Sequence, residues 1–277
     1  MKNNFKAVMI DLDGTLLTDD KKITDYSRQI LTILYEKGIK IIIATGRGLS
    51  RAKQLTAKLD FDKIILANNG ATVEGSSNIK KEDLTLEYNV VEQLTTLAQE
   101  YGIRPYFFVE KKCSLLVDDR EDKSKFIDSV GKLSEIMTVK ERNLPIDDCL
   151  SMILISNKKN IAEIVDKIKD NELVTYHIHT KYFSKNVRML EVQNANTDKS
   201  TRARRILKQM KIDEEDVVAI GDAHNDLEMI RGFGLGVAMK NSCDELKQHA
   251  DKITKYTNEQ DGMAQFLEEL FGLRDYE

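Results

Sequence analysis

The chain has 277 residues, a length that predicts about two domains of roughly 150 residues each. Hydrophobic residues make up 41% and charged residues 32%, the balance of an ordinary globular protein. The formal net charge of −4 is not the basic excess that nucleic-acid binding requires, and no run of roughly 18 apolar residues predicts a membrane span.

Strands and helices alternate from the start of the chain. Residues 6–10 form a short apolar run, which is typical of a strand buried on both faces. Apolar residues at helical spacing then predict a helix over 23–37, which ends before Gly38. A strand over 39–44, a helix over 49–59 and a strand over 63–67 follow. This order predicts a parallel, right-handed sheet of the α/β class.

The pattern changes between residues 83 and 190. Segments resembling strands lie at 106–109, 114–117, 151–155 and 174–178, and segments resembling helices lie at 124–133 and 161–168. This stretch is long enough to form an α+β domain of its own. We therefore expect an inserted domain over 83–190.

The alternating pattern resumes after the insert. The predicted elements are helices over 201–210, 226–230, 242–249 and 259–271 and strands over 217–220 and 235–239. We expect residues 1–82 and 191–277 to form one Rossmann-like α/β core with a parallel sheet.

Polar residues follow several of the predicted core strands. Asp11 and Asp13 come after the first strand, Thr45 after the second, and Asp222 after the strand over 217–220. An Asp-x-Asp triplet alone also occurs in simple turns. The carboxyl ends of neighbouring parallel strands, however, lie about 4.8 Å apart on one edge of a sheet, where α/β proteins bind ligands. We expect these side chains to converge there.

The residue types suit the chemistry of phosphate esters. A phosphate dianion repels a carboxylate nucleophile, so a divalent cation has to lie between them. Mg²⁺ takes hard oxygen ligands, which Asp11 and Asp222 would supply together with the backbone carbonyl of Asp13. Lys199, near the start of a helix, would add positive charge. Thr45 offers a hydroxyl group and Asn225 an amide.

Four motifs stand in order along the chain: Asp11-Leu12-Asp13-Gly14-Thr15, Thr45-Gly46-Arg47, Lys199, and Gly221-Asp222-Ala223-His224-Asn225-Asp226. This set resembles the four motifs of the haloacid dehalogenase-like superfamily. The position of the insert and two further segments resemble the Cof-type phosphatases, which carry a class IIB cap: Asn69-Gly70-Ala71 and Gly236-Val237-Ala238-Met239.

The resemblance implies a role for each matching residue. Asp11 would be the nucleophile that forms an aspartyl-phosphate, and Asp13 the general acid and base. The implied phosphate-binding residues are Thr45, Gly46, Lys199 and Asn225, and the implied Mg²⁺ ligands are Asp11, Asp13 through its carbonyl, and Asp222. Ser200 departs from the pattern, since relatives commonly carry Gly after the lysine.

Other polar residues have weaker assignments. Asp226 is expected to support the site or to contact substrate, and Arg47 either reaches the rim of the site or pairs with an acid. Arg188 has similar status. His177 and His179 lie on one face of a strand, where a structural role is expected before substrate contact.

The cysteines and the first residues of the chain indicate in which cellular compartment the protein is expected. Cys113, Cys149 and Cys243 are widely spaced and form no Cys-x-x-Cys pair, so neither a disulfide framework nor a zinc site is expected. We expect small core residues in a reducing cytoplasm. The first residues run directly into a predicted strand, so we expect no signal peptide.

The combined prediction is a cytoplasmic, magnesium-dependent phosphatase that acts on small phosphorylated metabolites. Sugar phosphates are the first expectation and phosphorylated cofactors the second, with a cap that closes over the site and selects the substrate. The chain would be a monomer or homodimer without nucleic-acid or membrane partners. Two alternatives remain at this point: a phosphomutase, and a non-catalytic protein that binds phosphorylated metabolites.

Overall fold

The structure is a computed structural model that describes residues 4–75, 79–109, 114–118, 135–139, 147–180 and 185–273. The chain forms two compact units. The core unit contains Met1–Glu82 and Asp198–Glu277, and the inserted unit contains Asp83–Thr197. The predicted helix over 124–133 and Cys113 lie outside the described residues.

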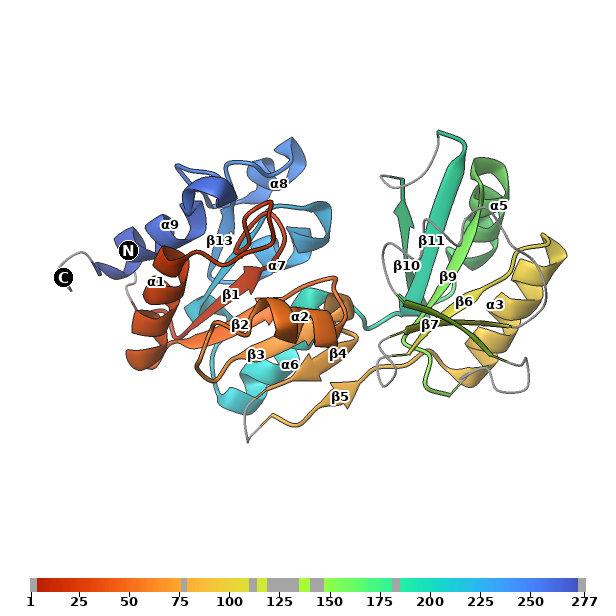
Figure 1. The fold of residues 1–277 in the computed structure, drawn as a ribbon, viewed down its shortest axis with the longest axis horizontal. Coiled ribbons are helices and arrows are strands. Elements are labelled where there is room, and N and C mark those ends of the chain that lie inside the picture. Colours follow the sequence, from red (N-terminus) through yellow and green to blue (C-terminus); the bar gives the residue numbers. More distant parts are fainter. Residues whose placement is uncertain are drawn as a thin grey trace. The chain divides into compact units, whose positions relative to one another are not determined.

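The core unit is built on an eight-stranded sheet (Figure 1). The strands run in the order β14-β13-β12-β1-β2-β3-β4-β5, and every neighbouring pair from β14 to β3 is parallel, whereas β3 and β4 are antiparallel. Their bounds are β1 Ala7–Asp11, β2 Lys40–Ala44, β3 Ile64–Ala67, β4 Thr72–Glu74, β5 Glu82–Asp83, β12 Val217–Gly221, β13 Leu235–Ala238 and β14 Lys252–Ile253.

Both faces of this sheet are covered by helices. One apolar cluster joins Val8 and Ile10 of β1 to helices α1 (Asp25–Glu36), α2 (Leu49–Leu55) and α9 (Gly262–Phe271). A second cluster joins Ala7 and Met9 to α6 (Lys199–Met210), α7 (Leu227–Gly232) and α8 (Asp244–His249). Alternate residues of β1 are therefore buried on opposite faces, as the continuous apolar run requires. The predicted α/β core with a parallel sheet is confirmed.

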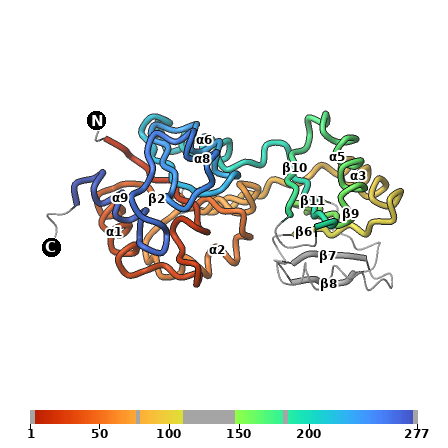
Figure 2. Tube along the Cα trace, turned by 90° about the horizontal axis from the view of Figure 1, so that it is seen from above, coloured from red at the N-terminus to blue at the C-terminus, as the bar shows by residue number. Residues whose placement is uncertain are grey.

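The inserted unit has a six-stranded sheet in the order β10-β11-β9-β6-β7-β8. All neighbours are antiparallel except β7 and β8. The strands are β6 Tyr106–Val109, β7 Ser114–Asp118, β8 Glu135–Val139, β9 Ser151–Asn157, β10 Val174–His179 and β11 Val187–Asn194. Helices α3 (Tyr88–Glu100) and α5 (Lys158–Ile168) lie on the same side of this sheet (Figure 2), where Leu94, Ile164 and Leu190 share one apolar cluster.

The predicted end of the insert needs correction. Residue 190 falls inside β11, and the inserted unit extends to Thr197. The reason is that β11 pairs along its length with β9 on one side and β10 on the other. Cutting the chain at residue 190 would split a central strand of this sheet.

Two further observations concern membrane-spanning helices and the burial of the cysteines. Among the described residues, no helix is both long and apolar enough to span a bilayer. Cys149 is buried, as predicted, whereas Cys243 is exposed because it lies at the N-cap of α8 rather than in the core.

Candidate active site

The predicted site lies at the carboxyl ends of the central core strands. Asp11 is the last residue of β1 and stands opposite Ala44 of β2, while Ile10 stands opposite Ile220 of β12. Thr45 and Asp222 therefore follow the two strands that flank Asp11. Asp11 and Thr45 are buried, and Asp222 is partly exposed.

Lys199 joins two of the acids. Its Nζ lies 2.6 Å from Oδ1 of Asp11 and 2.6 Å from Oδ1 of Asp226. All three side chains are buried, with Lys199 only 2% exposed. Oδ2 of Asp226 accepts hydrogen bonds from the backbone N–H groups of Asp222 and Ala223, each at 3.0 Å. Asp226 thus fixes both the lysine and the loop that carries Asp222.

The charges in this cluster do not balance. Burial raises the pKa of Asp11 well above its usual range, and the neighbouring carboxylates of Asp226 and Asp222 add to this effect against Lys199. Burial and the charge of Asp226 also raise the pKa of Asp222 to about 7. Burial works to lower the pKa of Lys199, but its two carboxylate partners outweigh that effect and raise it, so the ammonium stays charged.

The excess negative charge fits a divalent cation. Ligand oxygens of Asp11, Asp222 and Asp226 lie within 4.8 Å of one another. Both oxygens of Asp226 already accept hydrogen bonds, whereas Asp222 accepts a longer bond of 3.3 Å from Thr15 Oγ1. Asp11 and Asp222 are therefore the better placed carboxylates for a hard ion such as Mg²⁺.

Asp13 has a separate set of partners. Arg47 donates through Nε at 2.5 Å and through Nη2 at 2.7 Å, and Lys21 Nζ lies 2.7 Å from Oδ1. Burial alone would raise the pKa of Asp13, but the bonds from Arg47 and Lys21 outweigh it and hold that pKa below its ordinary value. Of the two predictions for Arg47, the structure shows pairing with an acid.

The predicted phosphate-binding residues surround these acids in different ways. Thr45 Oγ1 accepts a 3.1 Å bond from the backbone N–H of Arg47, which orders the turn through Gly46. Asn225 is exposed, and its Nδ2 donates to Oδ1 of Asn69 at 3.1 Å. Contact of these residues with a phosphate group stays a prediction.

The start of α6 explains how Lys199 is positioned. The N-cap Asp198 accepts a 2.8 Å bond from the N–H of Thr201 and a 2.7 Å bond from the hydroxyl of Ser200. Ser200, the departure from the usual glycine, is thus buried with a partner. The helix accordingly begins at Lys199, whose side chain enters the acid cluster.

Comparison with known proteins decides the family. A family model described as haloacid dehalogenase-like hydrolase matches residues 8–267. The chain belongs to this family of hydrolases. The resemblance drawn from the four motifs is thereby confirmed.

Several relatives match nearly the whole chain. The 5-amino-6-(5-phospho-D-ribitylamino)uracil phosphatase YitU of Bacillus subtilis is 28% identical over 96% of this chain and 97% of its own. The putative phosphatase YxeH of the same organism is 28% identical over 96% and 98%. A haloacid dehalogenase-like hydrolase from Bacteroides thetaiotaomicron shares the fold, with a TM-score of 0.79 and 24% identity over 96% of this chain and all of that one. The subclass IIB sugar phosphatase BT4131 shares it with a TM-score of 0.72 and 22% identity over 97% and 99%.

Sequence reasoning assigned no role to several residues of this hydrolase site. Thr15 and Asn69 stand within the motifs, and the structure bonds them to Asp222 and Asn225. Asn241 donates to the backbone carbonyl of Gly14 at 2.8 Å. It lies three residues after the end of β13, whereas Thr45 and Asp222 directly follow their strands, so the signal for Asn241 is weaker. Lys21 lies in a turn that carries no such signal.

The remaining polar candidates lie in the inserted unit of the hydrolase. His179 Nε2 is 3.0 Å from Oε2 of Glu191 on the neighbouring strand, which supports a structural role. Arg188 Nη1 donates to the backbone carbonyls of Lys185 and Val187, so it binds the backbone at the start of its own strand, β11.

Proposed function

We propose that the chain is a magnesium-dependent phosphatase that hydrolyses small phosphorylated metabolites through a phosphorylated Asp11. The observation that supports this proposal most directly is the placement of Asp11. Its carboxylate has a buried ammonium as hydrogen-bond partner and a second carboxylate, Asp222, within metal-bridging distance. This is the arrangement that a carboxylate nucleophile toward phosphorus requires.

The proposed reaction has two steps. In the first, a carboxylate oxygen of Asp11 forms a bond to phosphorus and the bond from phosphorus to the ester oxygen breaks. Asp13, released from Arg47 and Lys21 and protonated once substrate is bound, gives its proton to the leaving alkoxide. In the second, Asp13 takes a proton from water, the resulting oxygen bonds to phosphorus, and Asp11 is released together with inorganic phosphate.

The other residues serve binding and charge. Mg²⁺ held by Asp11, Asp222 and the carbonyl of Asp13 would neutralise charge between the carboxylate and the phosphoryl oxygens. Lys199 supplies a fixed positive charge next to the nucleophile. Thr45, Gly46 and Asn225 are proposed to bind phosphoryl oxygens, and Arg47 to control the protonation of Asp13.

The proposed substrates carry a phosphate ester on a small sugar or polyol. Support comes from the relatives: YitU is named for a phosphorylated ribitylamino uracil, and BT4131 for sugar phosphates. We further propose that the inserted unit is the cap that selects among such substrates, and that the protein is active in the cytoplasm.

Paired variants of the two acids test this proposal. With Mg²⁺ and a panel of phosphorylated metabolites, Asp11→Asn should abolish phosphate release and leave no trapped phospho-enzyme. Asp13→Asn should lose most turnover, while phosphorylation by an activated ester persists. Near wild-type turnover by Asp11→Asn would rule out the covalent route.

The same assay separates the alternatives. A phosphomutase would release no inorganic phosphate and would need a bisphosphate activator. A non-catalytic binding protein would turn over no ester in the presence of Mg²⁺. Steady phosphate release by the wild-type protein, without an activator, contradicts both.

A further inference from the structure

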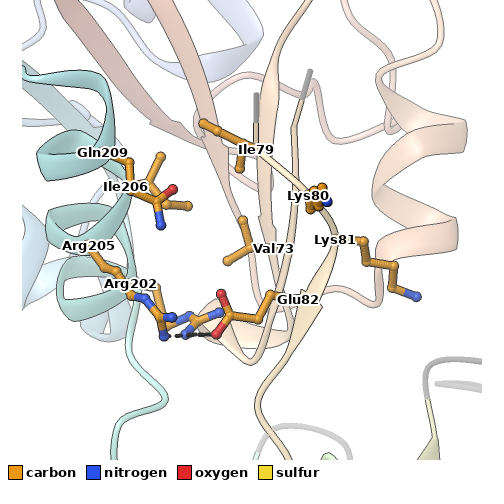
Figure 3. A pocket seen from close by; sticks show the side chains of 9 residues that line it. All are labelled: Val73, Ile79, Lys80, Lys81, Glu82, Arg202, Arg205, Ile206 and Gln209. Atoms are coloured by element: carbon orange, nitrogen blue, oxygen red, sulfur yellow. Dashed lines mark ion pairs between the residues drawn. The ribbon is translucent and has the colours of Figure 1, made fainter. Parts of the chain in front are cut away.

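A pocket in the core unit, outside the acid cluster, is lined by several basic side chains (Figure 3). It has a volume of about 500 Å³ and lies between α6 and the chain that connects β4 with β5. Apolar side chains of β4 and α6 form part of its wall. The polar residues that line it are Lys80, Lys81, Glu82, Arg202, Arg205 and Gln209.

Arg202 is the unusual member of this group. The side chain is 4% exposed, yet within the described part of the chain its Nε and Nη2 have no hydrogen-bond partner. The acid it faces is Glu82, with Nη1 3.5 Å from Oε1. A buried guanidinium with two nitrogen atoms that make no hydrogen bond destabilises the fold, because hydrogen bonds do not compensate for the loss of its hydration.

Glu82 does not satisfy this need. The same oxygen of Glu82 lies 2.8 Å from Nη1 of Arg205, so the carboxylate pairs better with the exposed arginine (Figure 3). One carboxylate therefore faces two guanidinium groups, and Lys80 adds a further cation to the lining. The pocket keeps a net positive charge.

The backbone holds Arg202 in this position. Gly70 has φ +99°, and a Cβ there would lie 2.9 Å from Cγ of Arg202 and 2.7 Å from the carbonyl oxygen of Asp198. The absence of a side chain at Gly70 thus lets the arginine stem pack closely. One turn of α6 presents two cations: Lys199 to the acid cluster and Arg202 to this pocket.

We propose that this pocket is a second anion site, separate from the catalytic centre, that binds a phosphate group. A phosphate oxyanion accepts the paired N–H donors of a guanidinium in the geometry that Arg202 leaves unused. The volume admits inorganic phosphate or the phosphate of a small metabolite. Glu82 is the last residue of the core unit before the insert. A ligand in this pocket would therefore lie beside the point where the chain leaves the core unit.

Calorimetric titration in EDTA tests the proposal. Without Mg²⁺ the acid cluster repels anions, so the binding of inorganic phosphate or of glycerol phosphate reports on the pocket. Arg202→Met keeps the stem but removes the donors and should weaken binding by about 10- to 100-fold, the loss expected for charged hydrogen bonds. Arg205→Gln, on an exposed side chain, should weaken it less. Binding of glycerol phosphate alone would identify a metabolite ester as the ligand.

Matched controls keep the result independent of the catalytic proposal. Lys208→Met removes a charge from the same helix outside the pocket, and Asp222→Asn alters the acid cluster; both should bind phosphate no more weakly than the wild type. The proposal is overturned if the wild-type protein binds neither anion in EDTA, or if Arg202→Met and Arg205→Gln bind as the wild type does.

Discussion

Lys199 and Asp226 act together at the residue scale. The ammonium contacts two buried carboxylates at 2.6 Å, and Asp226 also holds the backbone of the loop that carries Asp222. Asp11, Asp226 and the loop that carries Asp222 therefore depend on one another. Geometry set by such a network is expected to be sensitive to small displacements.

Gly14 shows this sensitivity most directly. It has φ +78°, and a Cβ there would overlap the carboxylate of Asp222. Gly14→Ala should lower the free energy of unfolding by about 1–2 kcal/mol through backbone strain alone. It should also push Asp222 aside and raise the Mg²⁺ concentration needed for half-maximal activity.

Gly38 offers a matched control for this substitution. It has φ +86°, but a Cβ at this position would meet no atom of the described chain within 4 Å beyond its immediate neighbours. Gly38→Ala should therefore show the same strain in urea unfolding with unchanged Mg²⁺ dependence. An equal effect of both variants on Mg²⁺ dependence would show that strain, and not the contact with Asp222, is responsible.

At the scale of elements, the first turn of α6 connects stability with the site. The side chain of Asp198 caps the helix by accepting a hydrogen bond from the backbone N–H of Thr201. It also accepts one from the hydroxyl group of the buried Ser200. Asp198→Ala should lower the free energy of unfolding by about 1 kcal/mol, the usual worth of such a cap. It should also lower kcat, because the turn that presents Lys199 becomes less ordered.

The cap of α5 serves as its comparison. Asn157 accepts a 2.9 Å bond from the N–H of Asn160 in the inserted unit. Asn157→Ala should cost a similar amount in unfolding experiments while kcat stays at the wild-type value. Equal losses of kcat in both variants would mean that helix stability in general, and not the position of Lys199, limits turnover.

Elements also show what the sequence could predict. The run before Asp11 and the strand before Asp222 are apolar on both faces, so their burial, and with it the convergence of the two acids, followed from local pattern. The antiparallel strands of the insert gave weaker signals. Strand β11 mixes Arg188, Glu191 and Gln193 with apolar residues, and only its pairing with β9 and β10 defines it. Helix α3 was missed although Val90, Val91 and Leu94 face the core at helical spacing.

Which side chains pair with one another could not be predicted, beyond the expectation that Arg47 either pairs with an acid or reaches the rim of the site. The partners of Asp13 come from Arg47 after β2 and from Lys21 in a loop, and that pairing depends on the loop path. The same holds for Arg202, which is buried beside Gly70. Helical spacing gives the direction of a side chain, whereas burial depends on what lies opposite.

At the scale of the whole molecule, we expect the acid cluster to make the stability of the protein depend on both pH and Mg²⁺. In the metal-free protein the pKa of Asp222 is raised from 3.8 to about 7, and that of Asp11 is raised as well. At any pH between 3.8 and about 7, Asp222 is therefore more often protonated in the folded state than in the unfolded state. The raised pKa of Asp222 alone should therefore make the free energy of unfolding fall by on the order of 2–4 kcal/mol as pH rises from about 4 to about 7, and Asp11 should add to this fall.

Mg²⁺ should reverse this trend, because the ion takes the place of the protons between the carboxylates. Unfolding of the core unit is measured in EDTA and in Mg²⁺ at pH 5, 6, 7 and 8, and the stabilisation by Mg²⁺ should grow with each step. Asp222→Asn, which removes one titrating carboxylate, should flatten the EDTA curve and reduce the Mg²⁺ effect at pH 8. Asp13 should not change the slope of this curve. Because its pKa is lowered in the folded state, its contribution to the free energy of unfolding is lost only as pH falls below its ordinary pKa of 3.8. A metal-free protein that became more stable between pH 5 and 7 would contradict the raised pKa values and, with them, the charge imbalance assigned to this site.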